Sequence, residues 1–184
     1  MKDMEKIALL FPGIGYHTDK PLLYYSKGLA AKHGYRIIEV SYSGFPANVK
    51  GDAEKMKQCF QMALEQTEEI LKEEHLQRAE LLVLAKSVGT AVAAAYLEKY
   101  HLTAKCVYYT PVEQSFQFIR ANSGIAFTGT ADPWVETEIV KACCEKMQLP
   151  LTIIPEGNHS LETGDVFRDL EIIQEVMEET EKFL

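Results

Sequence analysis

A serine in a particular local pattern is the first candidate for chemistry in this 184-residue chain. Ser87 has a small residue two positions before it (Ala85) and another two positions after it (Gly89), between an apolar run and a helical pattern. A serine on a sharp strand-to-helix turn projects its hydroxyl clear of the sheet, and small flanking residues let the backbones pass. The alternative is a serine that only caps the following helix. The pattern therefore predicts a nucleophile if suitable partners exist elsewhere in the chain.

An aspartate and a histidine follow later apolar runs, in the order Ser, Asp, His. Asp132 and His159 each come shortly after an apolar run that precedes a helical pattern. Each also has an ordinary alternative, since Asp132 could cap a helix ahead of Pro133 and His159 could be an exposed loop residue. In combination with Ser87 they predict a catalytic triad, with His159 as the general base and Asp132 as the acid that orients it.

The three residues need a scaffold that brings them to one edge. Short apolar runs, which predict strands covered on both faces, alternate with longer helical patterns. The strands are expected at Ile7–Phe11, Tyr35–Tyr42, Ala79–Ala85, Ala104–Tyr109, Gly124–Thr128 and Leu151–Ile154. This alternation predicts an α/β fold with right-handed crossovers, a mostly parallel twisted sheet of about six strands, and helices on both faces. Ligands of such folds bind at the carboxyl ends of the strands.

Apolar periodicity predicts the helices between these strands. One helix is expected to begin at Asp52 as its N-cap and to run to Leu71, and the others are expected at Val88–Tyr100, Val135–Met147 and Val166–Leu184. The helix at Val88–Tyr100 is apolar on nearly every side, so we expect it to be buried against the sheet. The last helix is expected to turn one apolar face inward, made of Phe167, Leu170, Ile173, Val176, Met177 and Phe183.

Composition limits the class of protein. With 19 Lys and Arg against 27 Asp and Glu, the net charge is −8, and 47% of the residues are hydrophobic, which is typical of a globular chain. The length predicts a single domain over residues 1–184. The acidic balance argues against nucleic acid or an anionic membrane as a partner. No apolar run approaches the roughly 20 residues of a membrane span, and the run before Pro12 is too short for a signal peptide, so a cytoplasmic location is expected.

With these residues in this order, the chain resembles the α/β hydrolases from Ile7 to the last helix. It is most similar to small, lidless members related to dienelactone-hydrolase-like and testis-expressed/KANSL-type hydrolase domains, in which a Gly-Asn-His-Ser-like turn supplies the base. The turn around His159 reads Gly-Asn-His-Ser. The resemblance implies a serine hydrolase that needs neither a metal nor an organic cofactor. The four cysteines do not have metal-ligand spacing either, so we expect no metal site.

The loop after the first predicted strand matches the position of the family's oxyanion loop. Gly13 matches the family's glycine, Pro12 replaces its histidine, and Ile14 falls where a backbone donor is expected. The resemblance therefore implies an oxyanion hole made by the N–H groups of Ile14 and Val88. The alternative for this loop is a nucleotide-binding turn. Its acidic ribose-binding residue would have to be Glu39, which is expected inside a strand rather than at its tip.

The substrate is expected to be a small or extended acyl compound, namely a carboxylic ester or a thioester. Only residues 111–123 separate the fourth and fifth predicted strands, where larger hydrolases often insert a lid, so we expect a minimal lid or none and an open site. Two other functions stay open: a non-catalytic binding module with the same fold, and an acyltransferase. The sequence does not determine the oligomeric state.

Several neighbouring residues are weaker candidates. The expected substrate-binding residues are Gly13, Tyr16, Lys86 and Trp134. Lys86 could steer an anionic substrate, but the favoured interpretation is a solvated lysine on an exposed elbow. Glu156 and Asp165 are alternative acids for the triad, and Asp165 is expected to cap the last helix.

Overall fold

A six-stranded parallel sheet forms the centre of the computed structural model, which describes residues 4–49 and 51–184. Its strands are β1 (Glu5–Phe11), β2 (Arg36–Glu39), β3 (Ala79–Lys86), β4 (Ala104–Tyr109), β5 (Gly124–Gly129) and β6 (Leu151–Ile154). The strand order is β2-β1-β3-β4-β5-β6, and every neighbouring pair is parallel. The order reverses between β1 and β3, so the loops that follow these two strands meet at the carboxyl edge. The predicted α/β architecture is confirmed.

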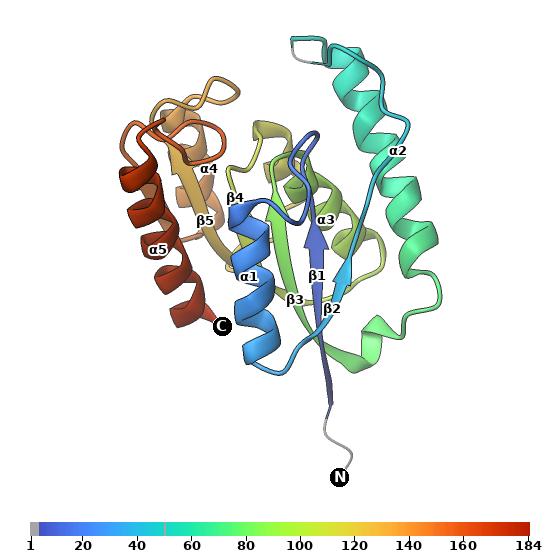
Figure 1. Cartoon of the computed structure of the whole chain (residues 1–184). Coiled ribbons are helices and arrows are strands. Elements are labelled where there is room, and N and C mark those ends of the chain that lie inside the picture. The colour runs from blue at the N-terminus through green and yellow to red at the C-terminus, as the bar shows by residue number, and fades with distance from the viewer. Residues whose placement is uncertain (1–3, 50) are drawn as a thin grey trace.

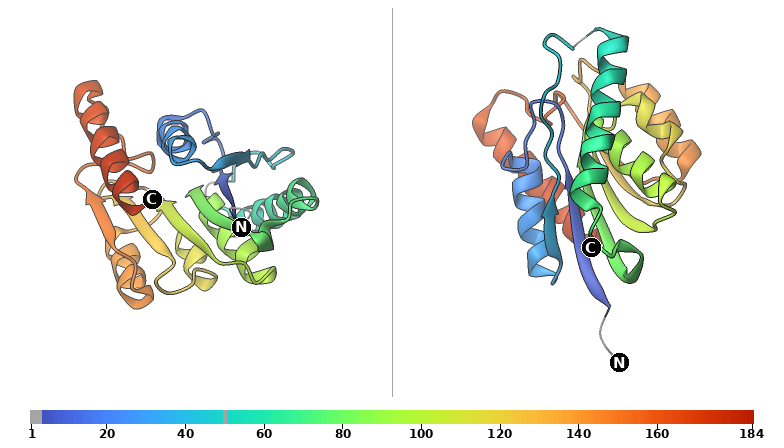
Figure 2. Two further views of the ribbon diagram at one scale, coloured as in Figure 1. Left: turned by 90° about the horizontal axis from the view of Figure 1, so that it is seen from below. Right: turned by 90° about the vertical axis from the view of Figure 1, so that its right-hand side faces the viewer.

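Helices cover both faces of this sheet (Figures 1 and 2). On one face lie α1 (Pro21–Lys32) and α5 (Val166–Phe183), and on the other lie α2 (Ala53–Leu71), α3 (Val88–Lys99) and α4 (Thr137–Met147). Two short 3₁₀ helices, η1 (Leu76–Arg78) and η2 (Glu113–Gln117), complete the elements. Each face has its own cluster of buried apolar side chains, so the sheet is covered on both sides, as its continuous apolar strands require.

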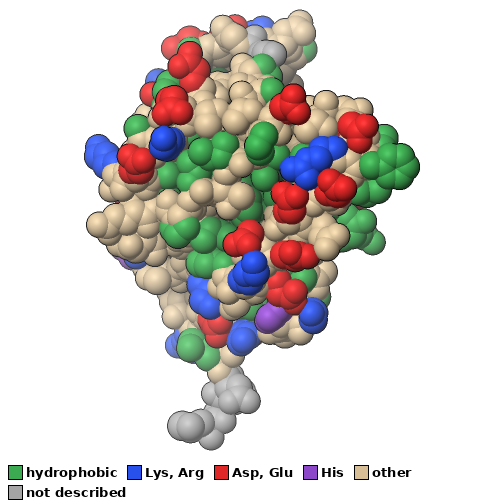
Figure 3. Space-filling view, turned by 90° about the vertical axis from the view of Figure 1, so that its left-hand side faces the viewer, with side chains coloured by type: hydrophobic (Ala, Val, Ile, Leu, Met, Phe, Trp, Pro, Cys, Tyr) green, Lys and Arg blue, Asp and Glu red, His purple; other side chains and the backbone are tan. Residues whose placement is uncertain are grey.

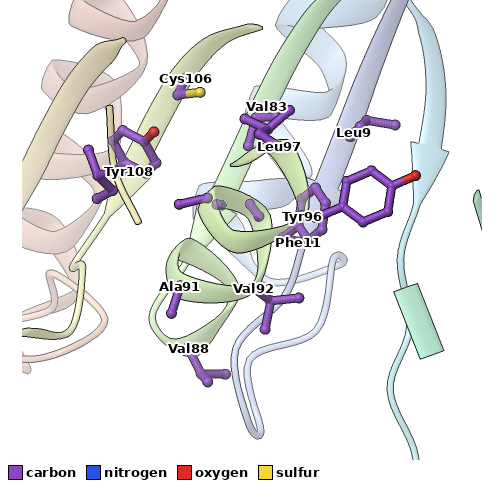
Figure 4. Close-up of a cluster of buried hydrophobic side chains, with 14 of the residues drawn as sticks. Leu9, Phe11, Val83, Val88, Ala91, Val92, Tyr96, Leu97, Cys106 and Tyr108 are labelled. Carbon is purple, nitrogen blue, oxygen red and sulfur yellow. The ribbon is translucent and has the colours of Figure 1, made fainter. Parts of the chain in front are cut away.

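The helix α3 is the most deeply buried, as predicted. All its residues from Val88 to Leu97 are buried. Figure 4 shows some of their apolar side chains, such as that of Val92, together with apolar side chains of β1, β3 and β4. Gly89 permits this close packing, because a Cβ at that position would lie 2.4 Å from the carbonyl oxygens of Phe11 and Pro12. The contact brings the start of α3 directly against the loop after β1.

The helix α1 is not predicted by the apolar pattern. Its buried positions are Leu22, Leu23, Ser26 and Ala30, which share one face of the helix. The apolar pattern is blurred because that face contains a serine and because the neighbouring Tyr24 and Tyr25 are about half exposed. Ser26 takes a core position because its hydroxyl bonds to the Leu22 carbonyl and shares a 2.7 Å hydrogen bond with the hydroxyl of Tyr109. Pro21 suits the first position of the helix, where no intrahelical N–H bond is needed. A tertiary hydrogen bond therefore supports a helix that the sequence pattern does not show.

The strand β2 is shorter than the predicted run of residues 35–42. Glu39 pairs in register with Leu10, and the N–H of Val40 donates to the Leu10 carbonyl at 2.9 Å. Because β1 ends at Phe11, the chain beyond Val40 has no strand to pair with and leaves the sheet. Glu39 is consequently the last residue of β2, and the expectation that it lies inside the strand is wrong.

The predicted N-caps of α2 and α5 are present, but part of the face of α5 that was predicted to be buried is exposed. The side chain of Asp52 accepts a 3.0 Å hydrogen bond from the N–H of the third residue of α2. The side chain of Asp165 accepts a 2.8 Å bond from the N–H of the third residue of α5. Phe167 and Leu170 are 79% and 60% exposed, so their predicted inward position is wrong. Burial on α5 begins only at Ile172, where the helix joins the core shared with α1. On the α5 side, Figure 3 shows apolar side chains projecting among charges of both signs.

The connection from β4 to β5 holds only η2 and short loops, so the expected absence of a large lid insertion agrees with this fold. No helix in the described part of the chain is long and apolar enough to cross a membrane.

Candidate active site

Ser87 occupies a strained turn between β3 and α3. Its backbone has φ 56° and ψ −127°, a conformation that costs a non-glycine residue about 1–3 kcal/mol. The surrounding backbone holds this turn, because the Ser87 N–H donates to the Tyr109 carbonyl at 3.0 Å and the Thr90 N–H donates to the Ser87 carbonyl at 2.9 Å. The Ser87 side chain makes no capping bond to α3. Ser87 is therefore not a side-chain cap, and its hydroxyl points elsewhere.

That hydroxyl meets the predicted histidine, which in turn meets the predicted aspartate. The Oγ of Ser87 lies 2.7 Å from Nε2 of His159, and Nδ1 of His159 lies 2.7 Å from Oδ2 of Asp132. The side chains of His159 and Asp132 are only 16% and 1% exposed, so neither is an ordinary surface residue. A carboxylate at Nδ1 favours the tautomer in which Nε2 can accept a proton. The three residues come from the loops after β3, β5 and β6, as the sequence order predicts.

The loop after β5 fixes the carboxylate of Asp132. Its Oδ1 accepts a 2.8 Å bond from the Trp134 N–H, which leaves Oδ2 for His159. The helix α4 begins only at Thr137, so Asp132 does not cap it. Gly129 lets this loop lie against the next one, because a Cβ there would lie 2.0 Å from the Gly157 carbonyl oxygen. The loops that carry Asp132 and His159 are therefore in close backbone contact.

The loop after β6 is held by a polar side chain of its own. The Oδ1 of Asn158 accepts bonds from the N–H groups of Ser160 and Glu162, at 2.7 and 3.2 Å. An asparagine that bonds its own following backbone closes a tight turn. Because His159 lies inside that turn, the turn fixes its backbone, while the ring is held by its bonds to Asp132 and Ser87.

Thr110, which the sequence analysis does not identify, contacts the loop that carries His159. It is fully buried directly after β4, and its Oγ1 donates a 3.0 Å bond to the His159 carbonyl. Its backbone φ of 44° is also unusual for a threonine. The available sequence signal was a hydroxyl residue just after a buried strand, at the edge where the triad was expected.

A cavity of about 180 Å³ opens beside the serine and the imidazole. Besides Ser87 and His159, its walls include Ile14, Tyr16, Lys86, Val88 and Trp134. Of the predicted pocket residues, only Gly13 lies outside these walls. Gly13 packs against Ser87 instead, where a Cβ would come within 3.1 Å of the Ser87 Cβ. Lys20, Met56 and Val112 also line the cavity without having been predicted.

The two expected oxyanion donors lie on this cavity. Gly13 and Tyr16 exchange two backbone hydrogen bonds, of 3.0 and 3.3 Å, which closes a tight turn around Ile14. Val88 is the first residue of α3, where backbone N–H groups have no intrahelical acceptor. Both Ile14 and Val88 border the space in front of Ser87.

Lys86 is 1% exposed, so the favoured interpretation of a solvated lysine is wrong. It is the last residue of β3, it pairs with Tyr109 of β4, and it lines the cavity beside Ser87. Its Nζ lies 4.9 Å from the ring centroid of Tyr16, within the range of a cation–π contact. Burial lowers the pKa of Lys86 to about 7. Within residues 4–49 and 51–184, no carboxylate lies within ion-pair distance of this ammonium.

Replacing Lys86 with methionine should therefore stabilise the fold most at low pH. In the folded protein the pKa is about 7, below the 10.5 of an unburied lysine, so between these values the unfolded chain binds more protons. Wild-type stability consequently rises with pH across that window. Below about pH 7 the whole cost of burying the charge is present, on the order of 5 kcal/mol. Urea unfolding should show the advantage of the Lys86→Met variant at about pH 6 and its decrease toward pH 10.

Lys141→Met, on the exposed surface of α4, is the control for losing a lysine. An advantage of Lys86→Met that stays constant from about pH 6 to pH 10 would contradict the burial of a charge at this position.

The alternative acidic residues do not bond to the His159 ring. Asp165 caps α5, as predicted, while Glu156 is exposed and His159 bonds to Asp132 instead. Glu39, the residue needed by a nucleotide site, pairs with Lys27 at 2.8 Å. Across the described residues, no group of three or more His, Cys, Asp or Glu side chains is placed to hold a metal ion.

Comparison with known proteins gives a match in structure but not in sequence. No protein-family model matches the chain, and no curated protein sequence matches it. Est1E from Butyrivibrio proteoclasticus, in complex with ferulic acid, superimposes with a TM-score of 0.71 at 11% identity, over 99% of this chain and 89% of its own. The esterase Pf2001 of Pyrococcus furiosus gives 0.66 at 15% identity, over 99% and 83%.

A third similar structure is XC6422 from Xanthomonas campestris, an α/β serine hydrolase without a lid. It superimposes with a TM-score of 0.62 at 12% identity, over the whole of this chain and 86% of its own. At such identities the likeness establishes a shared fold, which is that of the small α/β hydrolases.

Proposed function

We propose that this chain, which has the fold of the α/β hydrolases, is a serine hydrolase that cleaves carboxylic esters or thioesters. The observation that carries the proposal is the unbroken series of hydrogen bonds from the Ser87 hydroxyl through His159 to Asp132, at the edge of a cavity. The strained backbone of Ser87 also supports a functional role for this turn, because such strain costs stability and is concentrated at functional sites.

The reaction begins at the Ser87 oxygen. This oxygen forms a bond to the acyl carbon while Nε2 of His159, 2.7 Å away, takes the hydroxyl proton. The bond from the acyl carbon to the alcohol or thiol then breaks, and the leaving group receives that proton from the imidazolium. Water repeats the sequence in reverse on the acyl-enzyme and releases the acid. If another alcohol or thiol replaces the water, the same intermediate would support acyl transfer.

Two backbone groups would stabilise the negative charge of the intermediate. The N–H groups of Ile14 and Val88 belong to residues that border the space in front of Ser87, and we assign them to the oxyanion hole. Donors of this kind contribute roughly 3–4 kcal/mol each in other hydrolases. Because these are main-chain groups, an isoleucine and a valine serve as well as other residues.

The shape of the surface supports small or extended acyl groups. The cavity at Ser87 holds only about 180 Å³, but a more apolar hollow of about 390 Å³ lies next to it. Met56, Val88 and Val112 line both spaces, so an acyl chain could pass from one to the other. Phe60 and Phe118, whose stacked rings lie 5.6 Å apart, offer apolar contact in the larger hollow.

A fluorophosphonate probe tests this proposal directly. The folded protein should incorporate one probe molecule at Ser87, identified by peptide mass spectrometry, because only an activated serine displaces fluoride quickly. His159→Ala should slow labelling by about 100-fold or more, since the general base is lost. The exposed Ser43 provides the control, because Ser43→Ala should label like the wild type. A folded protein that does not react at Ser87 would refute the hydrolase assignment.

A further inference from the structure

We infer that the preferred substrate carries a carboxylate near its scissile ester, and that Lys86 and Lys20 bind this carboxylate in the cavity beside Ser87. The inference rests on the proposed hydrolase function and specifies the substrate class of the same site. The net charge of the protein, −8, would by itself disfavour a negatively charged substrate, so the inference depends on the local charge of the cavity.

The first support is the place of Lys86. It is the residue directly before the nucleophile, it is 1% exposed, and it lines the same cavity as Ser87 and His159. Burying an ammonium group without a close counter-ion is costly, so such groups are usually paired. Since the Lys86 side chain lines the cavity beside Ser87, an anion bound in that cavity would offset the cost of burying its positive charge.

The second support is a second cation on the same ring. The ammonium of Lys20 lies 5.3 Å from the ring centroid of Tyr16, and that of Lys86 lies 4.9 Å from it. The ring itself is fixed, because the Tyr16 hydroxyl accepts a 3.1 Å bond from the Leu22 N–H at the start of α1. Lys20 also lines the cavity. Two lysine side chains therefore line one small site and contact the same ring, in a protein whose net charge is −8.

The carboxylates around Lys86 do not replace the proposed ligand. Asp132 and Glu162 act on Lys86 only through space. Both oxygens of Asp132 are already bound, to His159 and to the Trp134 N–H, and Glu162 is exposed. A substrate carboxylate would thus be the first anion in direct contact with the buried ammonium.

The size of the space favours a carboxylate over a phosphate. About 180 Å³ must hold the scissile ester as well as the anionic group. A carboxylate is compact and carries one charge, which one fully buried lysine can neutralise. Contact with a charged group of this kind changes binding by about 10- to 100-fold.

Two matched pairs of esters test the inference at about pH 6, where Lys86 is protonated. Phenyl hexanoate and phenyl hydrogen adipate have acyl chains of equal length and differ by a terminal carboxylate. Methyl 4-acetoxyphenylacetate and free 4-acetoxyphenylacetate differ in the same way on the leaving group. In at least one pair the acidic ester should have a kcat/KM about 10-fold higher or more, mainly through a lower KM.

Substitutions then connect this preference to the two lysines. Lys86→Met should reduce the ratio of acidic to neutral kcat/KM by about 10- to 100-fold, and Lys20→Met by about 3- to 10-fold, because Lys20 is half-exposed. Lys141→Met should leave the ratio unchanged. Fluorophosphonate labelling of Ser87 verifies that each variant keeps a folded site, and Lys20→Met provides the test if Lys86→Met does not fold.

Each outcome bears on one proposal. Cleavage of the neutral esters without any preference for the acidic ones would overturn the carboxylate site and leave the hydrolase assignment intact. A preference that survives in both lysine variants would also overturn it. A higher kcat/KM for 4-acetoxybenzylphosphonate than for 4-acetoxyphenylacetate would assign the site to phosphate instead. No cleavage of any ester and no labelling of Ser87 would instead refute the hydrolase function itself.

Discussion

Replacing Ser87 with alanine should lower kcat for ester hydrolysis by about 10⁶-fold, as loss of the nucleophile does in other triads. The alanine removes only the oxygen that lies 2.7 Å from Nε2 of His159, so the cavity and its oxyanion donors should persist. KM should therefore change little compared with kcat. Steady-state kinetics with phenyl hexanoate, supported by single-turnover measurements for the slow variant, give both values.

Ser43→Ala is the matched control, because it deletes an exposed hydroxyl that bonds to Gln66 on α2. It should retain the kcat of the wild type. A loss of only about 10-fold in Ser87→Ala would place the activity at another residue.

Replacing Asp132 with asparagine should lower kcat by about 10⁴-fold through the tautomer of His159. The Trp134 N–H donates to Oδ1 of Asp132, so an asparagine will place its carbonyl there and turn its NH₂ toward Nδ1 of His159. Nδ1 must then accept a hydrogen bond, and the ring proton moves to Nε2. A protonated Nε2 cannot take the proton of Ser87. Kinetics with the same ester, together with nitrogen chemical shifts of the imidazole, measure both consequences.

Asp165→Asn is the control for this substitution. Asp165 also accepts a backbone N–H bond, at the start of α5, and asparagine is an equally good helix cap. We expect wild-type kcat from this variant. Equal losses in the two variants would show that the effect arises from general destabilisation rather than from the imidazole.

The strands and the order of the catalytic candidates could be predicted because each depends on local information. Continuous apolar runs such as Leu81–Ala85 form strands wherever both faces are covered. Once the strands are parallel, their carboxyl ends must share an edge, so the sequence order alone places Ser87, Asp132 and His159 at one edge of the sheet. The caps at Asp52 and Asp165 were equally accessible, because a cap needs only a few neighbouring residues.

The features that were missed depend on contacts between distant segments. The helix α1 is supported by the hydrogen bond between Ser26 and Tyr109, which are 83 residues apart. The strand β2 stops where its partner β1 stops, and no property of residues 40–42 indicates this end. Thr110 reaches the His159 carbonyl across 49 positions. Hydrophobic periodicity along the sequence does not reveal these contacts, because each one joins segments that are far apart in the chain.

By itself the sequence determined the alternation of elements, the parallel sheet and the edge at which the reactive side chains gather, because hydrophobic burial and crossover geometry act on patterns along the chain. Only the tertiary structure decided the environment of Lys86. Whether a lysine after a buried strand reaches solvent depends on what covers it, and here Tyr16, from a loop 70 positions earlier, lies over its ammonium. The charge of the pocket is therefore a property of the packing, since burial and distance, rather than residue type, set the free energy of a charged group.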